Sequence, residues 1–361
     1  MLSAVHQLLP VFAGGDAIGH HVLHAQQVLR EAGFESEIYV EEAHPAVRRR
    51  ARHYRELRAR PGDRLLYHLS TGSPMAAFLA EQDRPVLVYY HNITPASFFA
   101  RWEPVAATNV ARAREELRKL ASVTRLAMAN SEYSARELRE EGYAETAVVP
   151  VLVDFADLDA EPDAAAIARL RRAAEQGGHR WLFVGRLAPN KCQHDVIGAF
   201  AAYRALFDPA ARLCLVGGST STAYRRALVQ LADELGVGGA VELPDVVTFP
   251  ELLAQYRAAD VFVSLSEHEG FCVPLLEAMH FGVPVVARAT TAVPETVGDA
   301  GLLLPEGDSG KDPVVVATAV RRVLADGGLR ARLVAAGRER VARFSLAETG
   351  RRFLDVLAAH E

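Results

Sequence analysis

Residues 260–287 read DVFVSLSEHEGFCVPLLEAMHFGVPVVA and predict a strand, a turn, a helix and a second strand in succession. The run DVFVSLS is typical of a buried strand, EHEGFC of its exit turn, and VPVVA of the next strand. We expect Pro274 at the first position of the helix, where its missing N–H leaves no hydrogen bond unmade. Such a unit is the building block of a parallel α/β sheet.

Apolar runs alternate with helical patterns in the same way along the whole chain. The expected strands of the first half lie within residues 4–12, 36–40, 64–70, 85–91, 125–130 and 147–153. Those of the second half lie within residues 180–187, 212–218, 240–247, 260–266, 283–287 and 301–305. Helical periodicity between them, as in residues 20–33 with Gly33 as the C-cap, predicts two doubly wound, Rossmann-like α/β domains.

The chain of 361 residues is long enough for two hydrophobic cores. We expect an N-terminal domain at residues 1–153, an acidic, proline-containing linker at 154–178, a second domain at 179–344 and a terminal helix at 345–361. Doubly wound domains bind ligands at the carboxyl ends of their strands, so two of them are expected to face each other across a cleft.

Composition argues against several classes of protein. A formal net charge of −5 disfavours a general nucleic-acid-binding protein. The first residues lack a basic start and a small-residue cleavage site, and no apolar run approaches the roughly 20 residues of a membrane span, so we expect a cytoplasmic protein. The cysteines are odd in number and far apart, which disfavours a disulfide or zinc framework.

The first unusual turn is GRLAPNK, residues 185–191, which follows the strand WLFV. Gly185 allows the backbone to bend tightly, and both Arg186 and Lys191 can reach one anion from this loop. A diphosphate fits this arrangement, because it carries several charges over a short distance. A solvated turn that caps the following helix explains the same residues equally well.

The second unusual turn is EHEGFC together with the start of its helix. Glu269 precedes the turn, and Glu277 is predicted in the first helical turn, where each acid can accept hydrogen bonds from hydroxyl groups such as those of a ribose. Ordinary helix capping by the two acids is the alternative. The backbone N–H groups expected to bind a phosphate at the positive end of this helix are those of Gly270, Phe271, Cys272 and Val273.

Together these segments resemble a known family. VGRLAPNK, YRAADVFVSLSEHEGFCVPLLEAMHFGVPVVA and GDAGLLLP are similar to the donor-binding half of GT-B glycosyltransferases of family 4, which share a G-R-x4-K turn and an E-x7-E element in this order. The resemblance covers residues 181–305. It implies the GT-B fold, with two Rossmann-like domains and a C-terminal helix that crosses back.

The resemblance also implies an activity: the retaining transfer of a hexose from a nucleotide diphosphate sugar. The donor is expected to be GDP-mannose or a UDP-hexose, since YHNITP is similar to bacterial mannosyltransferases. The acceptor is expected to be a hydroxyl of a saccharide or lipid-linked substrate, in the synthesis of surface polysaccharides or glycoconjugates. Cys272 stands where the family commonly has glycine, which leaves the donor sugar open.

The family's pattern assigns a role to each motif residue. Arg186 and Lys191 would neutralise the leaving diphosphate, Glu277 would hold the ribose, Glu269 would hold the donor sugar, and main-chain groups around Val246 would face the base. Fixed cations and helix amides can stabilise the leaving group by themselves, so we expect neither a metal ion nor a cofactor beyond the nucleotide sugar.

The first half carries weaker signals. AGGDAIGHHV follows the first strand at the place of the family's Gly-rich loop, but Asp16 and Ala17 stand where the paired glycines of G-G-x3-H-V would lie. We expect Gly15 and Asp16 to approach the donor, and Gly14, Gly15 and Gly19 to do the work of that loop at shifted positions. The segment has no G-x-G-x-x-G fingerprint, which disfavours a dinucleotide site.

His91 ends the strand in VLVYYHNITP, where the family often has a histidine near the reacting sugar. We therefore group it with the catalytic residues, and a hydrogen-bonded strand-end histidine is the alternative. Ser131 and Ser134 are expected to cap a helix. Glu295 matches a recurrent glutamate of the family, and a structural role explains it equally well.

Residues 44–60 are dense in arginine. An exposed helix is the simplest interpretation. The alternative is a docking face for a lipid-linked acceptor or for the inner face of the cell membrane, to which the protein would then bind peripherally.

Three rival functions stay open. A GT-B sugar phosphorylase or nucleotide-sugar epimerase would keep the fold and change the reaction. An NAD-dependent dehydrogenase would need the missing fingerprint. A non-catalytic partner would bind the nucleotide sugar on behalf of another transferase.

Overall fold

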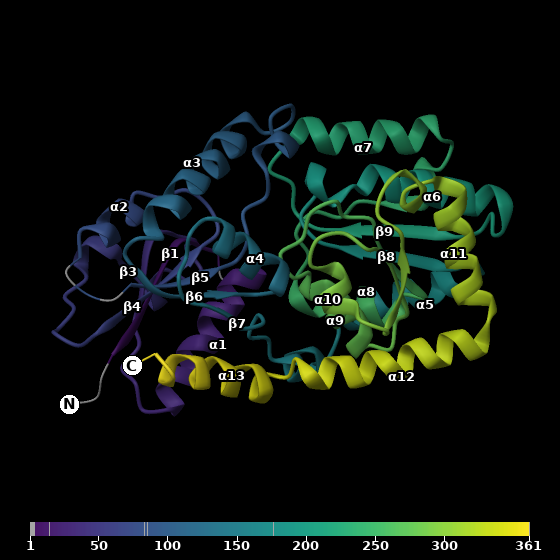
Figure 1. The fold of residues 1–361 in the computed structure, drawn as a ribbon. Coiled ribbons are helices and arrows are strands. Elements are labelled where there is room, and N and C mark those ends of the chain that lie inside the picture. Colours follow the sequence, from purple (N-terminus) through teal and green to yellow (C-terminus); the bar gives the residue numbers. More distant parts are fainter. Residues whose placement is uncertain (1–3, 14, 83, 85, 176, 361) are drawn as a thin grey trace. The chain divides into compact units, whose positions relative to one another are not determined.

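Every strand of the first sheet is parallel to its neighbours. The computed structural model describes residues 4–13, 15–82, 84, 86–175 and 177–360. Within them the first sheet has the order β3-β2-β1-β4-β5-β6-β7 (Figure 1). Its strands are β1 (Val5–Phe12), β2 (Ile38–Ala43), β3 (Arg52–His53), β4 (Arg64–Leu69), β5 (Val86–Tyr90), β6 (Thr124–Ala129) and β7 (Thr146–Val148).

Helices cover both faces of this sheet, because successive side chains of each strand point to opposite sides and both sets are apolar. Leu66 packs against one layer and Tyr67 against the other. The first layer consists of α1 (Ala17–Glu31) and α13 (Leu346–Ala358), and the second of α2 (Met75–Ala80), α3 (Pro104–Leu120) and α4 (Glu132–Glu140). The C-cap of α1 is Ala32 and not the predicted Gly33, which follows it with a φ of 89°.

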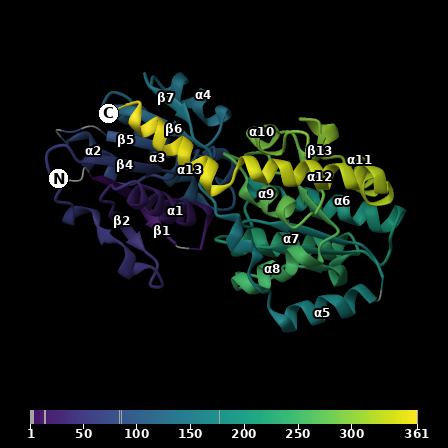
Figure 2. The same cartoon turned by 90° about the horizontal axis from the view of Figure 1, so that it is seen from below.

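The second sheet has the order β10-β9-β8-β11-β12-β13 and is also parallel. Its strands are β8 (Arg180–Val184), β9 (Arg212–Val216), β10 (Val241–Glu242), β11 (Val261–Ser264), β12 (Val285–Arg288) and β13 (Gly301–Leu304). Trp181 and Phe183 pack against α6 (Gln193–Leu206), α7 (Thr222–Glu234) and α11 (Pro313–Ala325). On the other face Phe262 stacks on Tyr256 of α8 (Phe249–Ala258), and α8 packs beside α5 (Ala164–Glu175) (Figure 2).

The chain forms two units. The first contains Met1–Ala100, Pro104–Asp154 and Arg343–Glu361, and the second contains Arg101–Glu103 and Phe155–Ala342. Both sheets have the strand order of doubly wound folds, which confirms the predicted class of two Rossmann-like domains. Apart from Asp154, the segment predicted as a linker lies in the second unit, and it includes α5.

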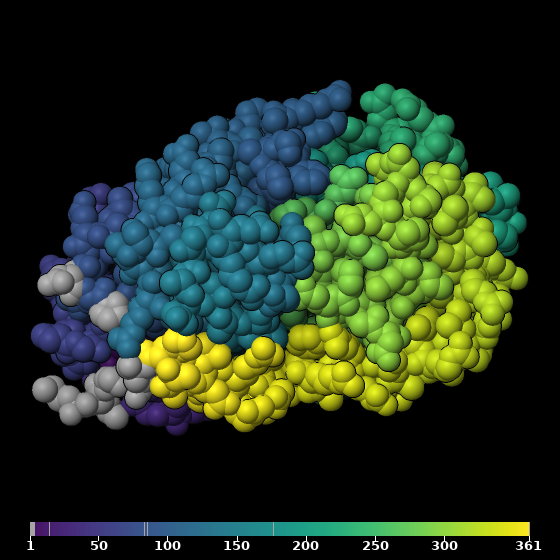
Figure 3. All heavy atoms as spheres, in the orientation of Figure 1, coloured from purple at the N-terminus to yellow at the C-terminus, as the bar shows by residue number. Residues whose placement is uncertain are grey.

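The chain returns to the first unit after α12 (Gly327–Arg343), so the terminal helix crosses back as expected. There α13 packs against α1 at Gly350, where a Cβ would lie only 3.0 Å from Val28. Figure 3 shows the lime-coloured atoms of the chain after β12 on the visible surface of the second unit.

A short excursion of the chain, Arg101–Glu103, also belongs to the second unit. The carbonyl oxygen of Trp102 accepts a hydrogen bond from Ser221 Oγ at 3.0 Å, and its ring packs edge-on against Tyr224. Glu103 is buried and accepts a hydrogen bond from Thr220 Oγ1. These contacts fix the excursion at the start of α7.

The helix predicted for the arginine-rich segment is wrong. Residues 44–60 form two 3₁₀ turns, Arg48–Arg50 and Tyr54–Glu56, with β3 between them. The segment lacks an apolar stripe of helical spacing, and its apolar side chains Tyr54 and Leu57 instead enter the core. The arginines stay on the surface, as is common at an edge strand. Among the described residues, every helix is too short or too polar to cross a bilayer.

We predict that Phe353→Ala in α13 lowers the free energy of unfolding by about 3 to 5 kcal/mol, because the buried ring fills the space between α13 and the first sheet. The neighbouring exposed residue supplies the control, and Arg352→Ala is expected to change stability by less than about 0.5 kcal/mol. Urea unfolding measures both, and equal effects of the two variants would contradict the packing of α13.

Candidate functional site

The second sheet reverses its strand order at β8, which pairs with β9 on one side and with β11 on the other. In doubly wound sheets ligands bind beside the carboxyl ends of the strands at such a switch point. The loops that leave β8 and β11 hold the two predicted turns, residues 185–191 and 267–272. The strand order therefore brings both turns to one place.

Asn190 ties the two loops together. Its Nδ2 donates to the carbonyl oxygen of His268 at 3.2 Å, and its own carbonyl oxygen accepts from the backbone N–H of Glu267 at 2.9 Å. Its Oδ1 is buried and has no hydrogen-bond partner among the described residues, which is unusual for a buried amide. The sequence indicated Asn190 only as part of a turn.

Lys191 and Glu269 form an ion pair at the centre of these loops. The distance from Lys191 Nζ to Glu269 Oε2 is 2.6 Å, and only 7% of the Glu269 side chain is exposed. The backbone N–H of Glu269 donates to Thr291 Oγ1 at 2.9 Å. The family's pattern gave these two residues separate partners, whereas in the structure each neutralises the other.

The exit turns of β8 and β9 run side by side. Gly217 has a φ of 153°, and a Cβ on it would lie 2.0 Å from the carbonyl oxygen of Gly185. Arg186 is exposed on the first of these turns. Val246 is 85% exposed and lies against the second, since a Cβ on Gly218 would be 3.1 Å from its Cγ2. The predicted phosphate and base residues thus share one surface.

Helix α9 (Val273–His280) begins beside the ion pair. Cys272 precedes it in the left-handed conformation, with φ 73° and ψ 66°. The helix therefore starts one residue earlier than expected, and Pro274 is its second residue. The backbone N–H groups of Gly270 and Cys272 have no acceptor in the described part of the chain. Such groups at a helix N-terminus attract anions.

Glu277 lies in the second turn of α9, so its predicted position in the first turn is wrong. Tyr256 donates a hydrogen bond from its hydroxyl to Glu277 Oε2 at 2.5 Å. Burial raises the pKa of Glu277, and the tyrosine hydroxyl opposes this rise. Sequence reasoning missed Tyr256, because an aromatic residue at helical spacing looks like any core residue.

The surrounding residues include further charges that the sequence analysis missed. Glu267 pairs with the buried Arg288 at 3.1 Å and with Lys311 at 3.6 Å.

Hydrogen bonds to backbone carbonyls hold the segment around residues 293–297. The carbonyl oxygen of Phe271 accepts a hydrogen bond from Thr296 Oγ1 at 2.5 Å. The backbone carbonyl of Glu295 accepts from Arg340, which supports a structural role for this segment.

In the first unit Asp16 is the N-cap of α1, and its Oδ1 accepts from the backbone N–H of Gly19 at 2.7 Å. Its carboxylate is therefore engaged by the helix. Gly15 is exposed just before it, and Gly14 lies outside the described residues. Ser131 caps α4 as predicted, whereas Ser134 is the third residue of that helix and not a cap.

His91 directly follows β5 and belongs to a cluster that sequence reasoning missed. Its Nε2 lies 3.1 Å from Nδ1 of His68, and ring nitrogens of His21, His68 and His91 all lie within 4.8 Å of one another. Burial lowers the pKa of each of the three rings. Only the His-His pair at positions 20–21 hinted at this cluster in the sequence.

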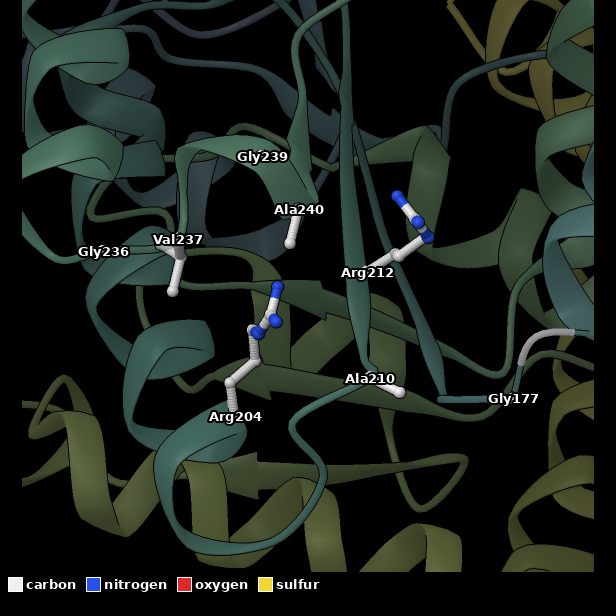
Figure 4. A pocket seen from close by; sticks show the side chains of 8 residues that line it. All are labelled: Gly177, Arg204, Ala210, Arg212, Gly236, Val237, Gly239 and Ala240. Atoms are coloured by element: carbon white, nitrogen blue, oxygen red, sulfur yellow. The ribbon is translucent and has the colours of Figure 1, made fainter.

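A hollow of about 390 Å³ lies at the other end of the strands of the second sheet, away from these loops (Figure 4). Gly177 precedes β8, Arg212 opens β9, and Ala240 precedes β10, so the hollow faces the amino ends of the strands. The guanidinium of Arg204 points towards Ala240 and that of Arg212 points away from it, so the two cations do not converge on one anion. We do not assign the site to this hollow.

Comparison with known proteins gives one family. Residues 171–340 match the family described as glycosyl transferases group 1. The chain is similar to the D-inositol 3-phosphate glycosyltransferase of Salinispora arenicola, with 34% identity over 261 residues, 68% of this chain and 57% of the relative. The relative of the same name in Geodermatophilus obscurus is 37% identical over 241 residues, 64% of this chain and 51% of the relative. The chain spans about half the length of these curated relatives.

Solved structures share the fold at low sequence identity. The sucrose-phosphate synthase (tll1590) from Thermosynechococcus elongatus has a TM-score of 0.74 and 21% identity, covering 99% of this chain and 98% of the other. Anabaena Alr3699/HepE, in complex with UDP and glucose, has a TM-score of 0.71 and 18% identity, covering 99% of this chain and 100% of the other. These likenesses confirm the GT-B fold that the resemblance implied.

We predict that Cys272→Gly is at least as stable as the wild type, because glycine adopts the left-handed conformation without steric cost. Cys272→Val is expected to lower the free energy of unfolding by about 1 to 3 kcal/mol. Urea unfolding measures both variants. Cys214→Val, in the extended strand β9, controls for the change of side chain, and an equal loss there would contradict the backbone argument.

We predict that Glu277→Gln stabilises the protein relative to the wild type as the pH rises. Burial raises the pKa of Glu277 above its ordinary value of 4.5, so the folded chain holds this proton more tightly than the unfolded chain. Ionisation of Glu277 as the pH rises above 4.5 therefore lowers the free energy of unfolding of the wild type, and the glutamine variant has no such loss. Thermal unfolding at about pH 4.5 and about pH 7.5 should show the difference in Tm growing with pH. The exposed Glu339→Gln should show no such trend.

Proposed function

We propose that the chain transfers a hexose from a nucleotide diphosphate sugar to an acceptor hydroxyl, because residues 171–340 match the group 1 glycosyl transferases and the fold is GT-B. The observation that carries this proposal is the meeting of Lys191, Glu269 and the N-terminus of α9 at the switch point of the second sheet. A cation, carboxylates and the backbone N–H groups at a helix N-terminus, gathered at one sheet edge, suit a ligand with a diphosphate and several hydroxyls.

The diphosphate is the leaving group of the proposed reaction. As the bond from the anomeric carbon to its oxygen breaks, the electron pair stays on the diphosphate, and negative charge grows there. Lys191, Arg186 and the helix amides would stabilise that charge. For this role Lys191 would exchange Glu269 for phosphate oxygens, which would release the Glu269 carboxylate to hydroxyls of the sugar. The ion pair thus supports a coupled use of both residues.

We propose that Glu277, oriented by Tyr256, holds the ribose, and that the exposed main chain at Val246 faces the base. GDP-mannose and UDP-hexoses are the candidate donors, with retention of anomeric configuration and without a metal ion. The candidate acceptors are saccharides and lipid-linked hydroxyl compounds. The name of the curated relatives adds a second class, a phosphorylated cyclitol. A phosphorolytic or epimerising activity has no specific observation in its favour.

We predict that Lys191→Ala and Glu277→Ala each weaken binding of the nucleotide and lower turnover by about 100-fold or more, because each removes a group that contacts the donor. Thermal shift with UDP and GDP first identifies the nucleotide, since a bound ligand raises Tm. Transfer is then assayed with the matching sugar nucleotides and the acceptor classes above. Lys119→Ala, an exposed lysine of α3, is the matched control.

Wild-type rates in both variants, with the fold intact, would refute the proposal. Proton NMR of the product reads the anomeric configuration, and EDTA should leave the rate unchanged. Sugar phosphate released only when inorganic phosphate is added would favour the phosphorylase instead, and a change in nicotinamide absorbance would favour a dehydrogenase.

A further inference from the structure

Three histidines of the first unit gather where β4, β5 and α1 meet. His68 lies in β4, His91 follows β5, and His21 lies in α1. His21 and His68 are buried, and His91 is half-buried. Three neutral imidazoles at this spacing could bind a transition metal, so the hydrogen bonds of each ring decide what the cluster does.

A chain of hydrogen bonds fixes the proton positions on two of the rings. Gln7 Nε2 donates to the carbonyl oxygen of Val22 at 3.1 Å, and a carbonyl can only accept. The amide oxygen of Gln7 therefore faces His68 Nε2, 2.9 Å away, which must carry the proton. His68 Nδ1 is then an acceptor, and His91 Nε2, at 3.1 Å, must donate to it. In consequence His91 Nδ1 has no proton and presents a lone pair.

The ring of His91 is held in place and neutral. Its backbone N–H donates to the carbonyl oxygen of Leu69 at 3.0 Å, and its carbonyl oxygen accepts from Asn130 Nδ2 at 3.2 Å. Burial lowers its pKa to about 3, and the titratable groups that face it are His21, His68 and Tyr89. Among the described residues His91 Nδ1 has no hydrogen-bond partner, and it is not sealed from solvent.

The same reasoning argues against a metal. His21 Nδ1 accepts from the backbone N–H of Leu152 at 3.0 Å, so the proton of this neutral ring is on Nε2. That Nε2 is buried and has no partner in the described part of the chain. In this arrangement His21 Nε2 and His91 Nε2 carry protons, and the lone pair of His68 Nδ1 is used by His91. A metal would have to break this whole arrangement.

We propose that Gln7 and His68 are positioning residues that hold His91 in the Nε2–H tautomer, so that its Nδ1 accepts a hydrogen bond from a hydroxyl of a bound sugar. The inference rests on the proposed function, since it needs a sugar substrate. The opposite tautomer, or a protonated ring, would present a donor at the same place. The buried amide of Gln7 therefore determines which way the sugar hydroxyl must point.

Nitrogen-15 NMR of the full chain, labelled at histidine, reads the tautomers from two-bond N–H couplings. We expect the Nε2–H form for His21, His68 and His91, assigned with single histidine variants. His24 is the internal control, because its Nδ1 faces the carbonyl oxygen of Leu152 at 3.2 Å and must carry a proton. A proton on His91 Nδ1 would overturn the proposal. Displacement of the His91 Nε2 proton by an equivalent of Zn²⁺ would also overturn it.

The functional arm uses two substitutions of one residue. His68→Leu leaves the Nε2–H of His91 without an acceptor, so the proton should move to Nδ1. His68→Asn restores an acceptor near the position of His68 Nδ1. With GDP-mannose or UDP-glucose, whichever the wild type uses, we expect kcat to fall about tenfold in His68→Leu and to recover largely in His68→Asn. KM for the donor and affinity for the free nucleotide should change less than about twofold.

The outcomes separate the two proposals. A wild type that transfers no sugar refutes the proposed function, whereas the tautomers are read without any substrate. An active wild type whose His68→Leu variant has moved the proton to Nδ1 yet keeps its kcat refutes the inference alone. An equal loss of nucleotide affinity in both His68 variants would indicate damage to the fold and would also count against it.

Discussion

The ammonium of Lys191 and the carboxylate of Glu269, 2.6 Å apart and largely withdrawn from water, are the interaction on which the second unit's site depends. Each charge is tolerated at this depth only because the other is there, and removal of one partner from a buried pair typically costs about 3 to 5 kcal/mol. Their approach requires β8 and β11 to be neighbours, and Asn190 to hold the two exit loops in register. The strand order thus determines that these two charged side chains meet.

The two units share one architecture, but the carboxyl edge of one sheet carries charged groups and that of the other carries neutral groups. In the second, the carboxyl edge of the sheet carries ions and two backbone N–H groups without an acceptor among the described residues, which suit a phosphate. In the first, the corresponding edge carries the neutral imidazoles of His68 and His91, whose protons are placed by the Gln7 amide and which suit hydroxyl groups. In the second unit Asn190 holds together the two loops that carry the charges, and in the first unit Gln7 and His68 set the proton position on His91. The sheets supply the rigidity that both require.

Much of this could be predicted from the sequence, because apolar periodicity marks each strand and the motif spacing places Arg186, Lys191 and Glu269 on strand-end loops. The remainder depends on tertiary contacts. Tyr256 meets Glu277 and Gln7 meets His68 only after the sheets have formed, and no local pattern distinguishes these residues from core residues. The start of α9 lies one residue before the predicted start, since Cys272 adopts a left-handed conformation that is usual for glycine. The helix predicted for the arginine-rich segment is absent from its described residues because charge alone does not form a helix.

Because of the path of the chain, the second unit could be exchanged for that of a related protein. Apart from Arg101–Glu103, the second unit is one uninterrupted stretch, Phe155–Ala342, and the chain on either side of it belongs to the first unit. In topology it is an insertion, so the corresponding unit of a related chain could be grafted at two junctions. Besides the two junctions, such a chimera has one further requirement. The inserted unit must still donate hydrogen bonds to Trp102 and Glu103, as the hydroxyl groups of Ser221 and Thr220 now do.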